Sequence, residues 1–176
     1  SLLMANLQAS LHAMIDADKP LSAIVAKINN IIYQNTPLDK FITFFVGIID
    51  TSKHEMTYVN AGHNPPYIFT DGGELKTLEV GGLILGMMPG VQYDMAEIQL
   101  LPGDRLVTFT DGVTEAKAVS GEMYEEERLE QLIGKAVVDR VSIRQFADLL
   151  INELEHFSRG EPQADDITLL ALQVLE

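Results

Sequence analysis

The sequence predicts an α+β fold, because its helical and strand-like segments are grouped along the chain instead of alternating. Apolar residues recur at helical spacing in the opening segment, short runs of β-branched and aromatic residues follow, and helical spacing returns before one closing strand. The chain has 176 residues, 47% of them hydrophobic, which is enough to bury one ordinary core. We therefore expect a single domain over residues 1–176.

Two amphipathic helices are expected at the front of the chain. Residues 2–14 carry Leu, Met and Ala at three- and four-residue spacing among good helix formers. A second helix begins around Pro20, a residue suited to a first helical turn, and ends near Thr36. Its apolar side is formed by Leu21, Ile24, Ile28, Ile31 and Ile32.

From Phe41 onward the pattern changes to short strand-like runs that turn residues interrupt. Asp71-Gly72-Gly73 is typical of a hairpin turn. Antiparallel strands are expected over residues 43–50, 55–60, 67–70, 75–80, 93–100 and 105–110.

The last third of the chain predicts two helices and a closing strand. The helices are expected over residues 125–136 and 142–157, with Ser142 as the N-cap of the second. Residues 158–164 are polar and read as a loop, and residues 167–174 form the closing strand.

Charge and composition exclude several classes of partner. Twenty-six acidic residues against twelve basic ones give a net charge of -14, so we expect no nucleic-acid partner. No apolar run approaches the roughly 18 to 20 residues that span a bilayer, so no membrane span is expected. Cysteine is absent, which excludes disulfides and thiol nucleophiles and agrees with a cytoplasmic location.

Carboxylates stand at the ends of two predicted strands. Asp111 follows the strand at 105–110, and Asp165-Asp166 precede the closing strand. Carboxylate oxygens presented by neighbouring strands can meet at a hard divalent cation such as Mg²⁺ or Mn²⁺. A lone Asp111-Gly112 pair would be more typical of a hairpin corner, and Asp165-Asp166 alone of a solvated loop end.

Several stretches together resemble the C-terminal part of a SpoIIE/RsbU-like metal-dependent protein phosphatase domain (PPM, protein phosphatase type 2C-like). The most specific are Ala-Gly-His-Asn-Pro-Pro at 61–66 and Thr-Asp-Gly-Val-Thr-Glu-Ala at 110–116. Supporting stretches lie, in the same order as in the family, at 41–47, 85–86, 102–104 and 164–168. The similarity covers essentially the whole chain.

The resemblance implies a PPM-type αββα sandwich of antiparallel sheets flanked by helices. It also implies hydrolysis of phosphoserine or phosphothreonine on a partner protein, by water that two Mn²⁺ or Mg²⁺ ions activate, so no side chain of this chain is expected to be a catalytic nucleophile. Asp111 and Asp165 match metal-binding aspartates of the family. Asp166 stands where relatives often carry Asn, so hydrogen bonding beside the metal and direct ligation are both open. Gly112 is expected to let the backbone turn sharply after the ligand.

Other residues in the matching stretches are interpreted as structural. Glu115 is expected to support its loop. His63, between Gly62 and Asn64, is interpreted as a turn residue in a structural segment and not as a general acid.

The chain also departs from the family pattern. Relatives carry a Gly-Asp-Val-Ser-Gly-like motif before the helix that here begins at Leu2, and its Asp bridges both metal ions. No counterpart is present, so we expect a fragment, N-terminally truncated and inactive as purified, of a longer protein with a sensor or receiver domain upstream. Open sheet edges would favour a homodimer. Relatives often have Gly in place of Glu125, which here opens an acidic run interpreted as a solvated helix start.

The resemblance points to a substrate of the anti-sigma-factor-antagonist type, a phosphorylated regulatory protein. The main alternative is a non-catalytic phosphatase-like module whose first two helices transmit signals to partners. A carboxylate-only metal hydrolase of unrelated fold ranks last, because no further acidic or histidine ligand cluster is evident in the sequence.

Overall fold

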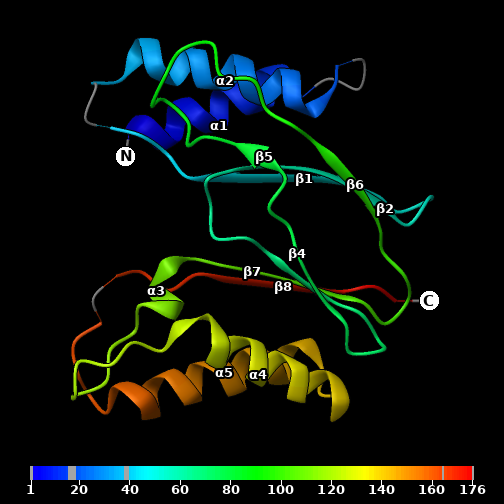
Figure 1. The fold of residues 1–176 in the computed structure, drawn as a ribbon, viewed down its shortest axis with the longest axis vertical. Coiled ribbons are helices and arrows are strands. Elements are labelled where there is room, and N and C mark those ends of the chain that lie inside the picture. Colours follow the sequence, from blue (N-terminus) through cyan, green and yellow to red (C-terminus); the bar gives the residue numbers. More distant parts are fainter. Residues whose placement is uncertain (1, 16–18, 38–39, 164, 176) are drawn as a thin grey trace. The chain divides into compact units, whose positions relative to one another are not determined.

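The computed structural model describes residues 2–15, 19–37, 40–163 and 165–175 (Figure 1). Its elements fall into two compact units, one formed by Ser1–Pro65 with Leu78–Leu100 and the other by Pro66–Thr77 with Leu101–Glu176. Each unit combines helices with a small, mainly antiparallel sheet, so the predicted α+β class is confirmed. That the units form a single domain stays a prediction. Within the described residues, no helix is both long and apolar enough to cross a membrane.

The first unit is built around the strand β2. Its sheet has β2 in the middle, antiparallel to β1 and β6 and parallel to β5, which departs from the all-antiparallel expectation. The predicted front helices are confirmed, and Pro20 lies just before the second as its N-cap. The elements of this unit are α1 (Leu2–Met14), α2 (Leu21–Asn35), β1 (Phe44–Asp50), β2 (Glu55–Ala61), β5 (Gly81–Gly82) and β6 (Ala96–Gln99).

The core of the first unit lies between α2 and the sheet. The apolar side of α2 is buried at Leu21, Ile24 and Ile28, as its spacing predicts. Asn29 is also fully buried on this helix, where its side chain donates to the Met88 oxygen over 2.8 Å and accepts from the Gly86 nitrogen over 2.8 Å. These bonds satisfy the buried amide. The remaining core members are Leu7, Val25, Ile32, Ile42, Val59, Ala61, Leu85 and Tyr93.

The second unit has a four-stranded antiparallel sheet in the order β4-β3-β7-β8. The hairpin predicted at Asp71-Gly72-Gly73 joins β3 to β4, and the Gly73 nitrogen donates to the Thr70 oxygen over 2.8 Å. The elements of this unit are β3 (Tyr67–Phe69), β4 (Leu75–Thr77), β7 (Arg105–Phe109), α3 (Asp111–Thr114), α4 (Glu125–Val138), α5 (Ile143–Ser158) and β8 (Leu169–Gln173).

Some strands are shorter than predicted, and for one of them the structure shows why it ends early. The strand expected over 75–80 ends at Thr77, because Asn60 binds the residues that follow. The Asn60 side chain donates to the Leu78 oxygen over 3.0 Å, and its backbone nitrogen donates to the Val80 oxygen over 2.9 Å. The strand expected over 93–100 is shorter in the structure, where β6 spans Ala96–Gln99. The short helix α3 was not predicted.

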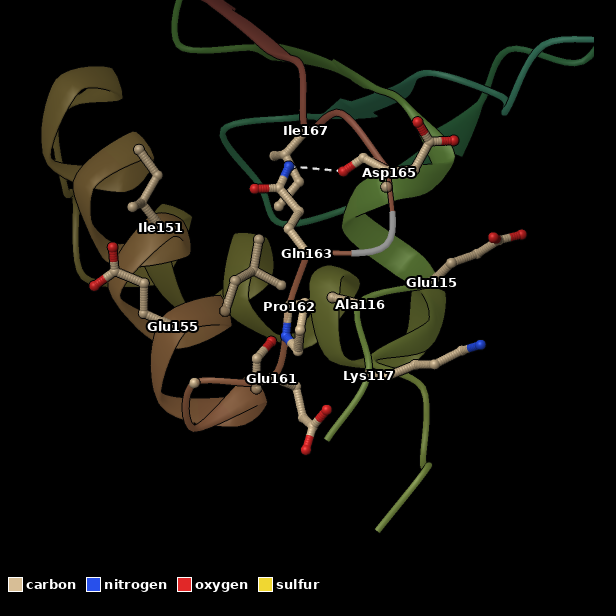
Figure 2. Close-up of a pocket in the computed structure, with 14 residues that line it drawn as sticks. Glu115, Ala116, Lys117, Ile151, Glu155, Glu161, Pro162, Gln163, Asp165 and Ile167 are labelled. Atoms are coloured by element: carbon tan, nitrogen blue, oxygen red, sulfur yellow. Dashed lines mark hydrogen bonds between the residues drawn. The ribbon is translucent and has the colours of Figure 1, made fainter. Parts of the chain in front are cut away.

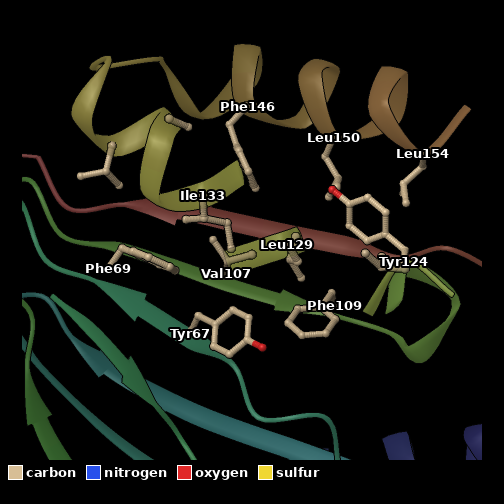
Figure 3. Packing of buried hydrophobic residues seen from close by; sticks show 13 residues of the cluster. Tyr67, Phe69, Val107, Phe109, Tyr124, Leu129, Ile133, Phe146, Leu150 and Leu154 are labelled. Atoms are coloured by element: carbon tan, nitrogen blue, oxygen red, sulfur yellow. The ribbon is translucent and has the colours of Figure 1, made fainter. Parts of the chain in front are cut away.

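Helices α4 and α5 cover one face of the second sheet (Figure 3). Tyr67 and Phe109 lie with ring centroids 5.3 Å apart beneath Leu129 and Ile133 of α4. Tyr124, just before α4, is fully buried, and its hydroxyl group donates to Glu153 over 3.0 Å. Burial raises the pKa of this phenol, and the nearby carboxylate raises it further. Dense aromatic packing therefore fixes both helices to the strands that carry the site.

Asp104, of the Pro-Gly-Asp stretch, is buried and structural. One carboxylate oxygen accepts from the Leu101 nitrogen over 2.9 Å, and the other accepts from the Asp71 nitrogen over 3.3 Å. The carboxylate thus joins the β3-β4 hairpin to the start of β7.

Candidate metal centre

The structure brings the two predicted carboxylate segments together. β7 pairs antiparallel with β8, and Phe109 lies opposite Leu169 at the end of the ladder. Just beyond it, the Thr110 nitrogen donates to the Thr168 oxygen over 3.0 Å. The register therefore places Asp111 beside the segment that begins at Asp165.

The side chain of Thr110 closes this junction. Its hydroxyl group donates to the Asp166 oxygen over 2.9 Å and accepts from the Thr168 nitrogen over 2.9 Å. The sequence alone predicts no such role for Thr110. The available signal was a hydroxyl side chain at the last position of an apolar strand, directly before an aspartate.

Gly112 contacts the second segment through its backbone, and this corrects the role expected for it. Its φ angle is outside the left-handed region, because it lies within the short helix α3. A Cβ atom at this position would stand 2.5 Å from the Asp166 oxygen and 3.3 Å from the Asp165 oxygen. Glycine is required here for close approach of two backbones and not for a sharp turn.

The three aspartates are exposed to solvent. One oxygen of Asp111 accepts from the Gly112 nitrogen over 3.0 Å, and one oxygen of Asp165 accepts from the Asp166 nitrogen over 2.7 Å. The Gln163 side chain donates to the backbone oxygen of Asp165 over 2.7 Å and so fixes this segment. A carboxylate has lone pairs beyond those that these bonds use.

The donor set fits a hard divalent cation, although it is incomplete. Carboxylate oxygens suit Mg²⁺ and Mn²⁺, and Mg²⁺ is often held by one or two carboxylates with water and phosphate completing its shell. In the described part of the chain, no group of three or more His, Asp or Glu side chains is arranged to hold a metal ion. The metal-binding roles of Asp111, Asp165 and Asp166 stay predictions.

Glu115 and His63 have local contacts that agree with structural roles. The Glu115 nitrogen donates to the Asp111 oxygen over 2.8 Å and closes α3, while its side chain is exposed. In the first unit, the side chain of Asn60 accepts from the His63 nitrogen over 2.8 Å and donates to the His63 oxygen over 3.0 Å. Asn60 thereby fixes the turn that contains the histidine.

The fold is that of solved PP2C phosphatase domains. The chain belongs to the family described as Stage II sporulation protein E (SpoIIE), whose model matches residues 1–175. The resemblance drawn from the motifs is therefore confirmed.

The chain covers only part of the length of two curated relatives. It is 31% identical over 152 residues to Protein IcfG of Synechocystis sp., covering 86% of this chain and 24% of IcfG. It is 28% identical over 176 residues to Phosphoserine phosphatase RsbU of Bacillus subtilis, covering 98% of this chain and 51% of RsbU. The chain thus spans about half or less of the length of these relatives.

Solved structures support the predicted PPM-type fold. The SiaA-PP2C domain of Pseudomonas aeruginosa matches with a TM-score of 0.80 at 20% identity, covering 98% of this chain and 67% of that one. The RsbU and RsbW domains of a Mycobacterium tuberculosis protein match with a TM-score of 0.75 at 26% identity, covering 99% of this chain and 47% of that one.

Proposed function

We propose that the protein carrying this domain is a metal-dependent phosphatase that removes phosphate from serine or threonine of a partner protein. The observation that supports this most strongly is the junction at Thr110, which holds the segments of Asp111 and Asp165 side by side at the ends of β7 and β8. Strands are stiff supports, so carboxylates at their ends are well placed to bind a cation without large rearrangement.

In this proposal Asp111 and Asp165 bind Mn²⁺ or Mg²⁺. Bound divalent ions would lower the pKa of a coordinated water and neutralise charge on the phosphoryl oxygens. The chain itself positions its carboxylates: Thr110 and Gly112 set the spacing of the two backbones, and Gln163 fixes the segment of Asp165. Asp166 contributes either a ligand oxygen or a hydrogen bond to a ligand.

The proposed substrate is a phosphorylated regulatory protein of the anti-sigma-factor-antagonist type. Two Bacillus subtilis relatives, RsbU and RsbP, carry the name phosphoserine phosphatase, which supports phosphoserine as the substrate group. The M. tuberculosis relative combines an RsbU with an RsbW domain, which supports a role beside other regulatory modules. Self-association is also proposed, through β8, which is the last strand in the sheet order of the described residues, or through the first helix.

The direct test is Mn²⁺-dependent hydrolysis of a phosphoserine protein by the longest natural form that carries residues 1–176. Asp111→Asn and Asp165→Asn are each expected to lower kcat/KM by at least about a hundredfold, because a ligand of the reacting centre is lost. Asp148→Asn, at an exposed position on α5, is the matched control and should leave turnover unchanged. Unchanged turnover in both site variants would remove the assignment.

A non-catalytic phosphatase-like module is the second candidate. The observation in its favour is that no complete metal-ligand group is present among the described residues. Titration calorimetry with Mn²⁺ distinguishes the two hypotheses. A metal-dependent phosphatase must bind Mn²⁺, and Asp111→Asn must weaken that binding. Absence of both binding and turnover in the longest natural form would favour the interaction module.

A further inference from the structure

A groove of about 510 Å³ lies next to the candidate metal centre, within the second unit (Figure 2). Asp165 and Gly112 line it, so it borders the metal centre directly. Its walls are the C-terminal half of α5, residues 115–117 after α3, and residues 160–163, 165 and 167 before β8. The proposed function gives no role to Ile151, Glu155 and Glu161, which also line the groove.

The groove contains apolar side chains that are exposed to solvent. Ile151 on α5 is 51% exposed and Ile167 is 36% exposed, although the buried core lies close by at Leu154. Ala116 and Pro162 complete the apolar lining. Exposed apolar side chains that gather in a concave site are typical of a binding surface.

The rim of the groove is acidic. Glu115, Glu155 and Glu161 contribute carboxylates against the ammonium group of Lys117, and all four side chains are exposed. Figure 2 shows the carboxylates of Glu115, Glu155 and Glu161 pointing outward in different directions around the apolar side chains. Such a rim attracts lysine and arginine and repels phosphate.

Local hydrogen bonds hold the walls in place. Arg159 and Gly160 have positive φ angles of 48° and 90°, and they reverse the chain at the end of α5. The Glu161 nitrogen then donates to the Ser158 oxygen over 3.0 Å. On the opposite wall, the Tyr124 nitrogen donates to the Ala116 oxygen over 2.9 Å. A preformed groove loses less conformational entropy when it binds a ligand.

We propose that this groove binds the stretch of the phosphoprotein substrate beside its phosphoserine, and that it selects an apolar side chain flanked by lysine or arginine. The inference rests on the proposed phosphatase function, because the shared Asp165 places the bound stretch next to the metal centre. The acidic rim repels the phosphate group itself. The groove therefore recognises the neighbours of the phosphoserine, and the cation recognises the phosphate.

The first test compares kcat/KM for two phosphoserine peptides, one with leucine and flanking arginines and a twin with glutamates in place of the arginines. The arginine peptide should be preferred, and Glu155→Lys combined with Glu161→Lys should lower that preference about tenfold, since attraction is replaced by repulsion. Ile151→Ser should weaken hydrolysis of both peptides severalfold. Hydrolysis of p-nitrophenyl phosphate, which is too small to fill the groove, reports the metal centre separately.

Matched controls lie on the same helix outside the groove. Asp148→Lys reverses one carboxylate charge at an exposed site and is the control for the glutamate variants. Leu149→Ser removes an apolar side chain that is 44% exposed and is the control for Ile151→Ser. Neither should change the peptide preference. A preference that survives in the double variant, or that falls equally in the controls, overturns the groove assignment.

Binding of the unphosphorylated arginine peptide, followed by fluorescence anisotropy, tests the groove independently of turnover. Wild-type binding that the double variant weakens at least about fivefold supports the groove even if no phosphate is released, in which case only the proposed function fails. Equal binding of the arginine and glutamate peptides, beside normal hydrolysis of p-nitrophenyl phosphate, overturns the groove and leaves the phosphatase function intact.

Discussion

The hydroxyl group of Thr110 bridges two backbone groups of the segment that carries Asp166, donating to the Asp166 oxygen and accepting from the Thr168 nitrogen, each over 2.9 Å. Thr110→Val keeps the shape of the side chain but loses both bonds. We expect the free energy of unfolding to fall by about 1–2 kcal/mol and Mn²⁺ affinity to fall with it. Urea denaturation and titration calorimetry measure the two effects.

Thr110→Ser is the control, because serine can make both bonds. It should retain most of the stability and affinity that the valine variant loses. If valine and serine behave alike, the hydroxyl group does not hold the junction together.

Gly112→Ala places a methyl group 2.5 Å from the Asp166 oxygen, so the two segments must separate. We expect a loss of about 2–3 kcal/mol in the free energy of unfolding, in the range of overpacking in a tight site. Gly134→Ala in α4 is the matched control, because its nearest neighbour would be Phe69 at 3.9 Å. That change should stabilise the protein by about 0.5–1 kcal/mol. Thermal and urea unfolding of both variants should therefore give shifts of opposite sign.

The pKa of Asp50 is expected near 2. A hydrogen bond from the Ser52 hydroxyl group, 2.6 Å long, is the main cause, and the Lys53 side chain and the two backbone nitrogens add to it. Because the pKa is lowered in the folded state, this group stabilises the fold above pH 3.8, and that contribution is lost as the pH falls toward 2. Carbon NMR of the carboxyl group measures the midpoint directly.

Ser52→Ala should move the Asp50 midpoint up toward 3.8, while Thr51→Ala at the neighbouring exposed position should leave it near 2. A midpoint that does not respond to Ser52→Ala would show that the hydroxyl group is not the cause.

Features that depend on neighbours in sequence were predictable. Ser142 caps α5 as expected, accepting from the Gln145 nitrogen over 3.3 Å while the Gln145 side chain accepts from the Ser142 nitrogen over 3.1 Å. The pairing of the strand before Asp111 with the strand after Asp165 was expected from the pattern of each strand together with the family resemblance. In each case a local pattern carried the information.

Features that depend on contacts distant in sequence were missed or misassigned. The sequence predicts Gly112 to be a turn residue. Its actual role depends on contact with the Asp166 backbone, which is distant in sequence. The predicted strand over 75–80 is longer than the observed one, because the sequence does not reveal that the Asn60 side chain binds the Leu78 oxygen. The groove was missed for the same reason, since three separate segments form its walls.

Glu125 adopts a φ angle of 64°, in the left-handed region that favours glycine. In Glu125→Gly, relief of that strain should stabilise the folded state by about 1–2 kcal/mol. The more flexible unfolded chain offsets part of this gain, so the free energy of unfolding should rise by about 0.5–1 kcal/mol. Glu126→Gly, one residue further into α4, has no such strain and should lose about 1 kcal/mol. Urea denaturation of both variants decides the matter, and equal losses in the two would contradict strain at Glu125.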